Sequence, residues 1–160
     1  MTNDKHLIIY SLLIFLFATS CSKEDNGKDL DKPVIETSSE AVPQNCQAYR
    51  KGEGIPFQCT FTDNVELGSY NIEIHHNFDH HTHSTEAGDC SLDKVKAPVR
   101  PWVYNKDFTI PEKSSRYDAQ VNIPVPAEID SGDYHFMIRV TDKSGWQELK
   151  AVSIKILDKE

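Results

Sequence analysis

Short runs of alternating apolar and polar residues constrain the fold of this chain more than any other feature. In the run 55–61, every second residue is apolar: Ile55, Phe57, Cys59 and Phe61. Similar runs cover residues 70–76, 117–123, 134–140 and, less regularly, 149–156. Because successive side chains of a β-strand point to opposite faces, each run predicts a half-buried strand.

Shorter apolar stretches at 33–35 and 102–110 predict further strands. The segments between them are polar, and we expect 38–54 and 77 to about 100 to be loops. Asp142-Lys143-Ser144-Gly145 is a hairpin-type turn. About seven short strands at regular spacing, with no convincing helix, predict an all-β fold of the β-sandwich type.

The stretch Asp130-Ser131-Gly132-Asp133-Tyr134 resembles the tyrosine corner that precedes strand F in immunoglobulin-like domains. Residues 134–145 resemble the F–G hairpin that closes many such modules. We therefore expect one immunoglobulin-like domain over residues 33–158. Trp102, Trp146 and Tyr104 could form an aromatic contact surface, although ordinary packing inside the sandwich is the better interpretation for Trp102.

The N-terminal residues have the pattern of an export signal. Lys5 and His6 precede the apolar run 7–18, which is too short to span a bilayer comfortably. Small residues then lead to Cys21, which resembles the lipidated cysteine of a bacterial lipobox. We expect a signal peptide at 1–20, and a lipidated Cys21 with a flexible tether at 21–32. A plain cleaved signal with a chance cysteine is the alternative.

Residues 22–26 resemble the surface-export tag of Bacteroidota lipoproteins, although a merely solvated tether would also be charged. We expect a protein that is lipid-anchored at the outer membrane and displayed at the cell surface. The formal charge of -8 argues against nucleic acid, which needs a basic patch, and against direct binding to anionic lipids. The membrane would be contacted through the lipid anchor only.

Five of the seven histidines lie between His75 and His83, and this crowding indicates a metal site. A polar loop that is histidine-rich by chance is the alternative. The run 70–76 leads directly into these residues. In an immunoglobulin-like sheet, the strand that begins at Tyr134 lies beside this one and runs antiparallel to it. The alternation then places His75 and His135 on the outward side, so we expect His135 to approach the cluster.

The expected ligands are three or four of five histidines: His75, His80, His81, His83 and His135. Asp79 is either a ligand or the acceptor that orients a histidine through its second N–H. His76 has core-facing parity, so packing is at least as good an interpretation as ligation. Glu73 is the nearest candidate base. Zn²⁺ is the first choice, with Cu²⁺ or Ni²⁺ as alternatives, and Ca²⁺ is not expected at nitrogen ligands.

Three cysteines remain in the domain, and an exported chain sits where disulfides persist. Cys59 lies on the apolar face of its strand, and we expect an inert buried thiol. The loops that carry Cys46 and Cys90 should emerge at the same end of the sandwich, which permits a disulfide. The alternative makes Cys90 a thiolate ligand, which would favour Cu(I) or a mixed zinc site.

The combination of a lipoprotein signal, residues 74–83 and Gly132-Asp133-Tyr134-His135-Phe136 resembles domain of unknown function 4625 (DUF4625), a family of Bacteroidota lipoproteins. The resemblance covers roughly residues 30–158. It implies an immunoglobulin-like fold and an exported lipoprotein, and it implies no established activity. The extra cysteines and the long segment 82–100 depart from the family pattern.

Three functions remain open at this point. The first is a surface lipoprotein that captures Zn²⁺ or Cu²⁺, with handover to an outer-membrane transporter or other surface protein. The second is a module that binds proteins or glycans and whose metal is structural. The third is a metal-dependent hydrolase with Glu73 as base, which we place last because no His-Glu-x-x-His or nucleophile elbow is present. We therefore expect that the protein is not an enzyme.

Overall fold

The computed structural model describes residues 28–36, 43–82 and 90–159. Eight β-strands make up its regular structure. They are β1 (Val34–Glu36), β2 (Gln47–Arg50), β3 (Gly54–Thr62), β4 (Leu67–His76), β5 (Tyr104–Thr109), β6 (Arg116–Pro124), β7 (Gly132–Asp142) and β8 (Gln147–Leu157). No helix in the described ranges is long and apolar enough to cross a membrane. The expected signal peptide and Cys21 lie outside these ranges.

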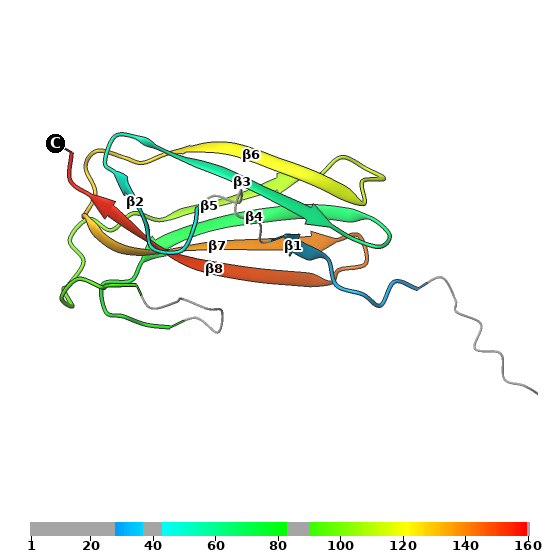
Figure 1. Cartoon of the computed structure of the whole chain (residues 1–160), viewed down its shortest axis with the longest axis horizontal. Coiled ribbons are helices and arrows are strands. Elements are labelled where there is room, and N and C mark those ends of the chain that lie inside the picture. The colour runs from blue at the N-terminus through cyan, green and yellow to red at the C-terminus, as the bar shows by residue number, and fades with distance from the viewer. Residues whose placement is uncertain (1–27, 37–42, 83–89, 160) are drawn as a thin grey trace, which may run out of the picture.

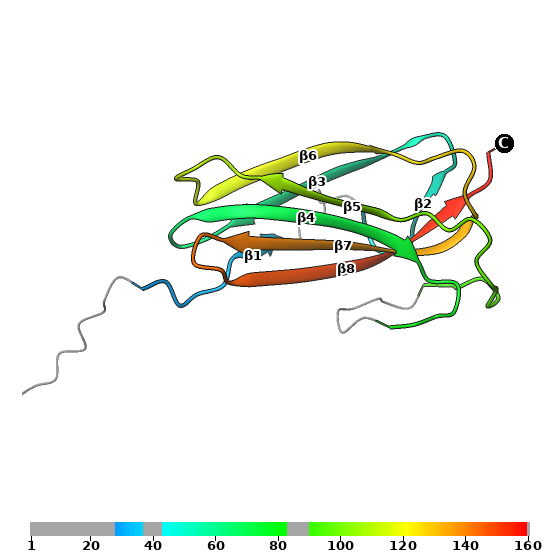
Figure 2. The same cartoon turned by 180° about the vertical axis from the view of Figure 1, so that it is seen from behind.

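The strands form two sheets that pack face to face (Figures 1 and 2). One sheet has the order β1-β3-β6 and the other has the order β2-β8-β7-β4-β5. With β3, β4, β6, β7 and β8 as strands B, C, E, F and G, this is the A-B-E and A′-G-F-C-C′ arrangement of an immunoglobulin-like sandwich. The prediction of that fold is confirmed, with eight strands where about seven were expected.

Strand β2 corrects the expectation that residues 38–54 form only loop. It pairs in parallel with β8, and Gln47 lies opposite Ile154. Of its four residues only Tyr49 is buried. A four-residue edge strand with one buried side chain has no alternation long enough to recognise in a sequence. Its position in the sheet depends on the partner strand instead of a local pattern.

The core lies between the sheets and uses the alternating residues that the sequence indicated. Phe57 of β3 is fully buried and stacks on Phe136 of β7, with 5.8 Å between ring centroids. Tyr70 of β4 stacks on Phe108 of β5 at 4.7 Å. Cys59 is buried on the same face of β3 as Phe57, and its burial raises the pKa of the thiol to about 11.

The tyrosine corner fixes the start of β7. The hydroxyl of fully buried Tyr134 donates to the carbonyl oxygen of Asp130 at 2.7 Å and accepts from the N–H of Trp102 at 3.3 Å. Burial raises the pKa of Tyr134 to about 12. Gly132 has a φ of 128°, and a Cβ there would lie 3.0 Å from the Phe78 ring. This end of β7 is therefore tightly specified, next to the histidine-rich segment.

Trp102 is buried, as packing inside the sandwich requires. Its ring lies 6.3 Å from that of Tyr134 and 6.2 Å from that of Tyr104, centroid to centroid. Trp146 lies in the β7–β8 hairpin, at the end of β7 that is far from Tyr134. The three aromatic residues therefore do not form one contact surface.

Candidate metal centre

The register of β4 and β7 brings two distant histidines together. The two strands are antiparallel neighbours, and His75 and His135 are Cα partners. Ile74 and Phe136 point into the core, which leaves the two histidines on the opposite face of the sheet. The expected placement of the F strand beside the C strand is confirmed.

His135 is 1% exposed, although its side chain points away from the core. The chain folds back after β4 and places His81 beside it, where the N–H at Nε2 of His135 donates to the backbone carbonyl of His81 at 3.1 Å. The expectation that His135 lies on the outward face of the sheet is correct, and its burial is a further finding. The alternation of a strand identifies the face but gives no sign of a loop that covers it.

Three imidazole rings converge at this point: His75 from β4, His81 from the following segment and His135 from β7. The ring centroids lie 5.5 Å apart for His75–His81, 5.5 Å for His75–His135 and 5.0 Å for His81–His135. The Nε2 atoms of His75 and His81 are 3.4 Å apart. Three of the residues predicted as ligands therefore lie side by side.

Two carboxylates lie behind two of these rings. Nδ1 of His81 is 2.6 Å from Oδ1 of Asp79, and Nδ1 of His75 is 3.0 Å from Oε1 of Glu73. The hydrogen bond from His81 is the main cause that lowers the pKa of the Asp79 carboxyl. A neutral ring that donates Nδ1–H to its carboxylate keeps its lone pair at Nε2. For His81 and Asp79, this is the arrangement in which a carboxylate orients a metal-binding histidine.

The geometry suits a small tetrahedral ion. With Zn–N distances of 2.0–2.1 Å, two ligand nitrogens of a tetrahedral site lie about 3.3–3.4 Å apart. The 3.4 Å between the Nε2 atoms of His75 and His81 meets that spacing. If His135 supplied a third nitrogen, one position would remain for water or an exchanging ligand. Such a donor set fits Zn²⁺, Cu²⁺ or Ni²⁺ better than an ion that prefers oxygen.

The remaining histidines of the cluster have other places. His80 adopts a left-handed backbone conformation with a φ of 60°, and its Nε2 donates to the carbonyl oxygen of Asp93 at 2.9 Å. His76 packs on Phe78 with 4.9 Å between ring centroids, which agrees with its core-facing parity. His83 lies outside the described residues. The structure thus gathers His75, His81 and His135, and it places His80 and His76 in packing and turn contacts.

The segment after β4 is anchored to the end of the sandwich. The buried Phe78 ring meets Tyr134 edge to face at 5.3 Å and lies under the ammonium group of Lys96 at 4.4 Å. The backbone N–H of Asn77 donates to the carbonyl of Asp133 at 2.8 Å, and that of Lys96 donates to the carbonyl of Phe78 at 3.0 Å. These contacts hold His81 against β7.

A disulfide joins Cys46 to Cys90, with an S–S distance of 1.96 Å and a Cα–Cα distance of 5.4 Å. This is the pairing that the loop argument favoured over a Cys90 thiolate ligand. The backbone N–H of Cys46 donates to the carbonyl of Ser153, and Ser153 is the Cα partner of His135 on β8. The disulfide therefore fastens the segment that follows the histidines to the strand next to His135.

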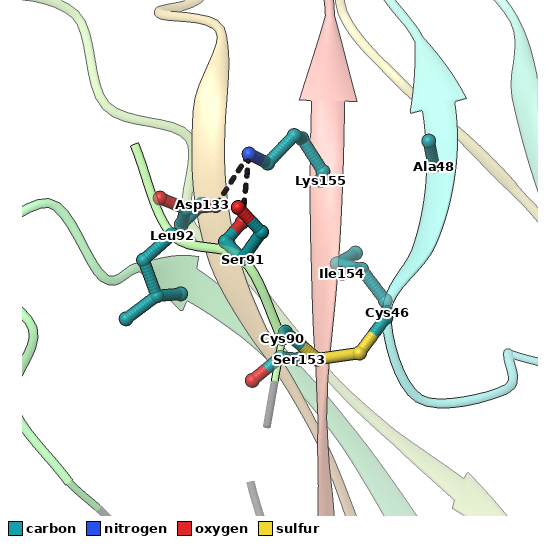
Figure 3. A pocket seen from close by; sticks show the side chains of 9 residues that line it. All are labelled: Cys46, Ala48, Cys90, Ser91, Leu92, Asp133, Ser153, Ile154 and Lys155. Atoms are coloured by element: carbon teal, nitrogen blue, oxygen red, sulfur yellow. Dashed lines mark hydrogen bonds and ion pairs between the residues drawn. A yellow bond between two sulfur atoms is a disulfide. The ribbon is translucent and has the colours of Figure 1, made fainter. Parts of the chain in front are cut away.

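A salt-bridge network beside the disulfide was not visible in the sequence. The ammonium group of Lys155 on β8 lies 2.9 Å from Asp93 and 3.3 Å from Asp133, and it donates to the carbonyl of Ser91 at 3.1 Å. Its hydrogen bond with Asp93 is the main cause that raises the pKa of Lys155. Figure 3 shows Lys155 with Asp133 and Ser91, beside the disulfide, in the lining of a hollow.

No local pattern marks Lys155 as part of this network, because its position is that of an ordinary outward residue between Ile154 and Ile156. Two of its partners, Ser91 and Asp93, come from a segment without regular structure, and the third, Asp133, lies on β7. The contacts with Ser91 and Asp93 fix residues 91–93, whose Asp93 carbonyl accepts from His80. The network therefore supports the turn that delivers His81 to the site.

Comparison with known proteins gives one family and two distant folds. A family model described as "Domain of unknown function (DUF4625)" matches residues 19–157. A solved structure titled "GspB Siglec domain" is 17% identical with a TM-score of 0.43, over 82% of this chain and 60% of that one. This chain thus spans about 60% of the length of that structure.

A second solved structure is Spo0M, a sporulation control protein from Bacillus subtilis, with 9% identity and a TM-score of 0.35. That match covers 81% of this chain and 49% of the other. No curated protein matches the chain.

Proposed function

The chain belongs to the family described as domain of unknown function DUF4625, and on that premise we propose that it binds a transition metal, Zn²⁺ in the first place. The ligands would be His75, His81 and His135, with Cu²⁺ and Ni²⁺ as the alternative ions. One observation carries the proposal: three imidazoles from separate segments converge, and Glu73 and Asp79 lie at Nδ1 of two of them.

We propose metal capture at the outer face of the cell as the purpose of this site. The side chains of His75 and His81 are 18% and 34% exposed, so an ion held there would be reachable from solvent. A fourth, open position allows an incoming ligand to join before a protein ligand leaves. This supports a cargo metal that passes to an outer-membrane transporter or another surface protein. The lipid anchor at Cys21 would hold the chain at the membrane.

The test is direct. The full-length chain, held in a mild detergent and stripped with a chelator, is titrated with Zn²⁺, Cu²⁺ and Ni²⁺, and its metal content is measured by element analysis after recovery from cells. We expect one ion per chain and a strong loss of binding in a variant with alanine at positions 75, 81 and 135. Gln120→Ala, at an exposed position of β6, is the control. Absence of stoichiometric binding by the intact fold would refute the proposal.

A second candidate function rests on a separate observation. Val95, Val99 and Val103 are 64%, 81% and 65% exposed, and they belong to the segment that the disulfide and Lys155 fasten at this end. Exposed valines on an anchored segment suit a surface that contacts another macromolecule. In that case the metal would be structural. Metal removal would then abolish partner binding, whereas a capture protein would release its ion and keep its fold.

A further inference from the structure

A second group of candidate ligands lies at the opposite end of the sandwich. Asp63 directly follows β3, Asp142 is the last residue of β7, and Asp29 precedes β1. One carboxylate oxygen from each lies within 4.8 Å of those of the other two. Asp142 is 4% exposed and Asp29 is 8% exposed, so two of the three side chains are buried more than nine-tenths.

In each of these carboxylates, the two oxygens have different surroundings. Oδ1 of Asp63 accepts the backbone N–H groups of Val65 and Glu66 at 2.9 and 2.7 Å. Oδ1 of Asp142 accepts from Trp146 at 2.8 Å, and Oδ1 of Asp29 accepts from Asp31 at 3.1 Å. The Oδ2 atom of all three is buried and has no hydrogen-bond partner. Backbone donors thus fix the orientation of the carboxylates and leave one oxygen of each unused.

Within the described parts of the chain, no lysine, arginine or histidine forms an ion pair with Asp29, Asp63 or Asp142. Burying an ionised carboxylate without a partner is costly, and three together also repel one another. A cation among the three Oδ2 atoms would remove both penalties.

We propose that Asp29, Asp63 and Asp142 form a calcium site. The donors are all oxygen, which a hard cation prefers. At Ca–O distances of 2.3–2.6 Å, two oxygens on one ion can lie up to about 5 Å apart, which accommodates the spacing here. The three carboxylates would supply part of a shell of six to eight oxygens, and water would complete it. Mg²⁺ fits less well, because its bonds are near 2.0–2.1 Å.

The ion would fasten the chain where it enters the domain. Asp29 belongs to the segment before β1, whereas Asp63 and Asp142 belong to the β3–β4 and β7–β8 turns (Figure 1). Trp146 already joins two of these parts, since its N–H donates to Asp142 and its Nε1–H donates to the Asp29 carbonyl at 3.1 Å. Binding in the range typical of extracellular modules, about 10⁻⁴–10⁻³ M, would suffice outside the cell.

This site is independent of the imidazoles. Leu67 pairs with Asp142 at one end of β4, and His75 pairs with His135 near the other. Eight residues of strand at about 3.3 Å each separate the two ends by roughly 26 Å. Substitution of a histidine therefore tests one site without altering the other.

Terbium luminescence suits the experiment, because Tb³⁺ replaces Ca²⁺ at oxygen sites and the Trp146 indole lies beside this one. The full-length chain, in mild detergent and treated with EGTA, is titrated with Tb³⁺ under tryptophan excitation, and Ca²⁺ or Mg²⁺ is then added. We expect sensitised emission that Ca²⁺ displaces at about 10⁻⁴–10⁻³ M. Ca²⁺ should also raise the melting temperature.

Two variants with a matched control make the result specific. Asp142→Asn and Asp63→Asn keep the shape of the side chain, and each should weaken Ca²⁺ binding at least tenfold and reduce the calcium-dependent rise in melting temperature. Asp118→Asn removes an exposed carboxylate of β6 and should change neither quantity, and the same holds for His81→Ala. If Asp142→Asn does not fold, Asp63→Asn gives the same comparison.

Three outcomes would overturn the proposal. The first is a wild-type chain with no sensitised emission and no calcium-dependent stability. The second is Tb³⁺ binding that persists unchanged in both asparagine variants, which would place the ion elsewhere. The third is displacement by Mg²⁺ at lower concentration than by Ca²⁺, which would reject calcium as the ion.

Discussion

His75 and His135 are Cα partners across β4 and β7, and their ring centroids lie 5.5 Å apart. The pairing arises from the strand order of the sandwich, because the two histidines are far apart in the sequence. One of them sits at the end of a strand and the other near the start of its neighbour. A strand pair thus supplies two of the proposed ligands, and the segment after β4 brings the third.

The first prediction concerns His135. His135→Ala and His81→Ala should weaken Zn²⁺ binding by similar amounts. Loss of a group that only hydrogen-bonds to a metal ligand costs roughly 10- to 100-fold in affinity, so loss of a ligand should cost at least that much. The physical reason is that each imidazole supplies one of three protein ligands. Competition with a chromogenic chelator measures the affinity, and Gln120→Ala, at an exposed position of β6, is the control. Unchanged affinity with intact circular dichroism would remove His135 from the site.

The second prediction concerns Asp79, which accepts from His81 Nδ1 at 2.6 Å. Asp79→Asn should weaken Zn²⁺ binding roughly 10- to 100-fold, because the ring loses the carboxylate that orients it. Asp118→Asn removes the charge of an exposed carboxylate on β6 and is the control, which should leave the Zn²⁺ affinity unchanged. Retention of full affinity would mean that His81 is held by other contacts.

The third prediction concerns the pH dependence that follows from the lowered pKa of Asp79. A carboxyl whose folded-state pKa is lowered stabilises the fold above its unfolded-state pKa, near 3.9, and loses this effect as pH falls through the folded value. Asp79 should therefore stay ionised from pH 7 to 5. A carboxyl NMR titration should give Asp79 a midpoint below 3.9, and a midpoint above it would contradict the hydrogen bond to His81.

The disulfide gives the fourth prediction. Cys46 and Cys90 are 44 residues apart in sequence, and the chain-entropy model assigns such a bridge about 4 kcal/mol of stability. Cys46→Ser with Cys90→Ser should lower the free energy of unfolding in urea by up to that amount and should also weaken Zn²⁺ binding. Cys59→Ala is the control, which should leave the metal affinity unchanged. Equal affinity with and without the bridge would show that the salt bridges of Lys155 suffice to hold the segment.

The fifth prediction concerns the buried thiol of Cys59. Burial raises its pKa to about 11, so at pH 8 it should react with iodoacetamide only after unfolding in urea. A raised folded-state pKa stabilises the fold fully below the unfolded-state value and loses this effect as pH rises toward 11. Cys59→Ala should therefore reduce the loss of stability between pH 9 and 11. Rapid alkylation of the native chain would contradict the burial.

Much of this architecture could be predicted from the sequence, because burial on one face of a strand leaves a period of two. The alternation in 55–61 and 70–76 predicted two strands of the core. The Asp130–Tyr134 stretch predicted the start of β7, and this start in turn placed His135 beside His75. These are local patterns combined with one rule about which strands are neighbours in an immunoglobulin-like sheet.

The remainder depends on contacts between segments that have no local signal. Strand β2 exists because β8 offers an edge to pair with, and Lys155 acquires its role from Asp93 and Asp133. The left-handed backbone of His80, which directs the chain back over β7, is unusual for a residue other than glycine and could not be inferred. The sequence marks Asp142 only as part of a hairpin-type turn.

The segment by which the chain enters the domain and the three imidazoles lie at opposite ends of the sandwich. This arrangement has a mechanical consequence. A partner that pulls at the imidazole end, while the N-terminal segment is held, applies its force along β4 and β7. Hydrogen bonds in antiparallel ladders run perpendicular to the strands, so such a load shears many of them at once. The domain should therefore resist tension in this direction far better than a pull that peels one strand from its edge.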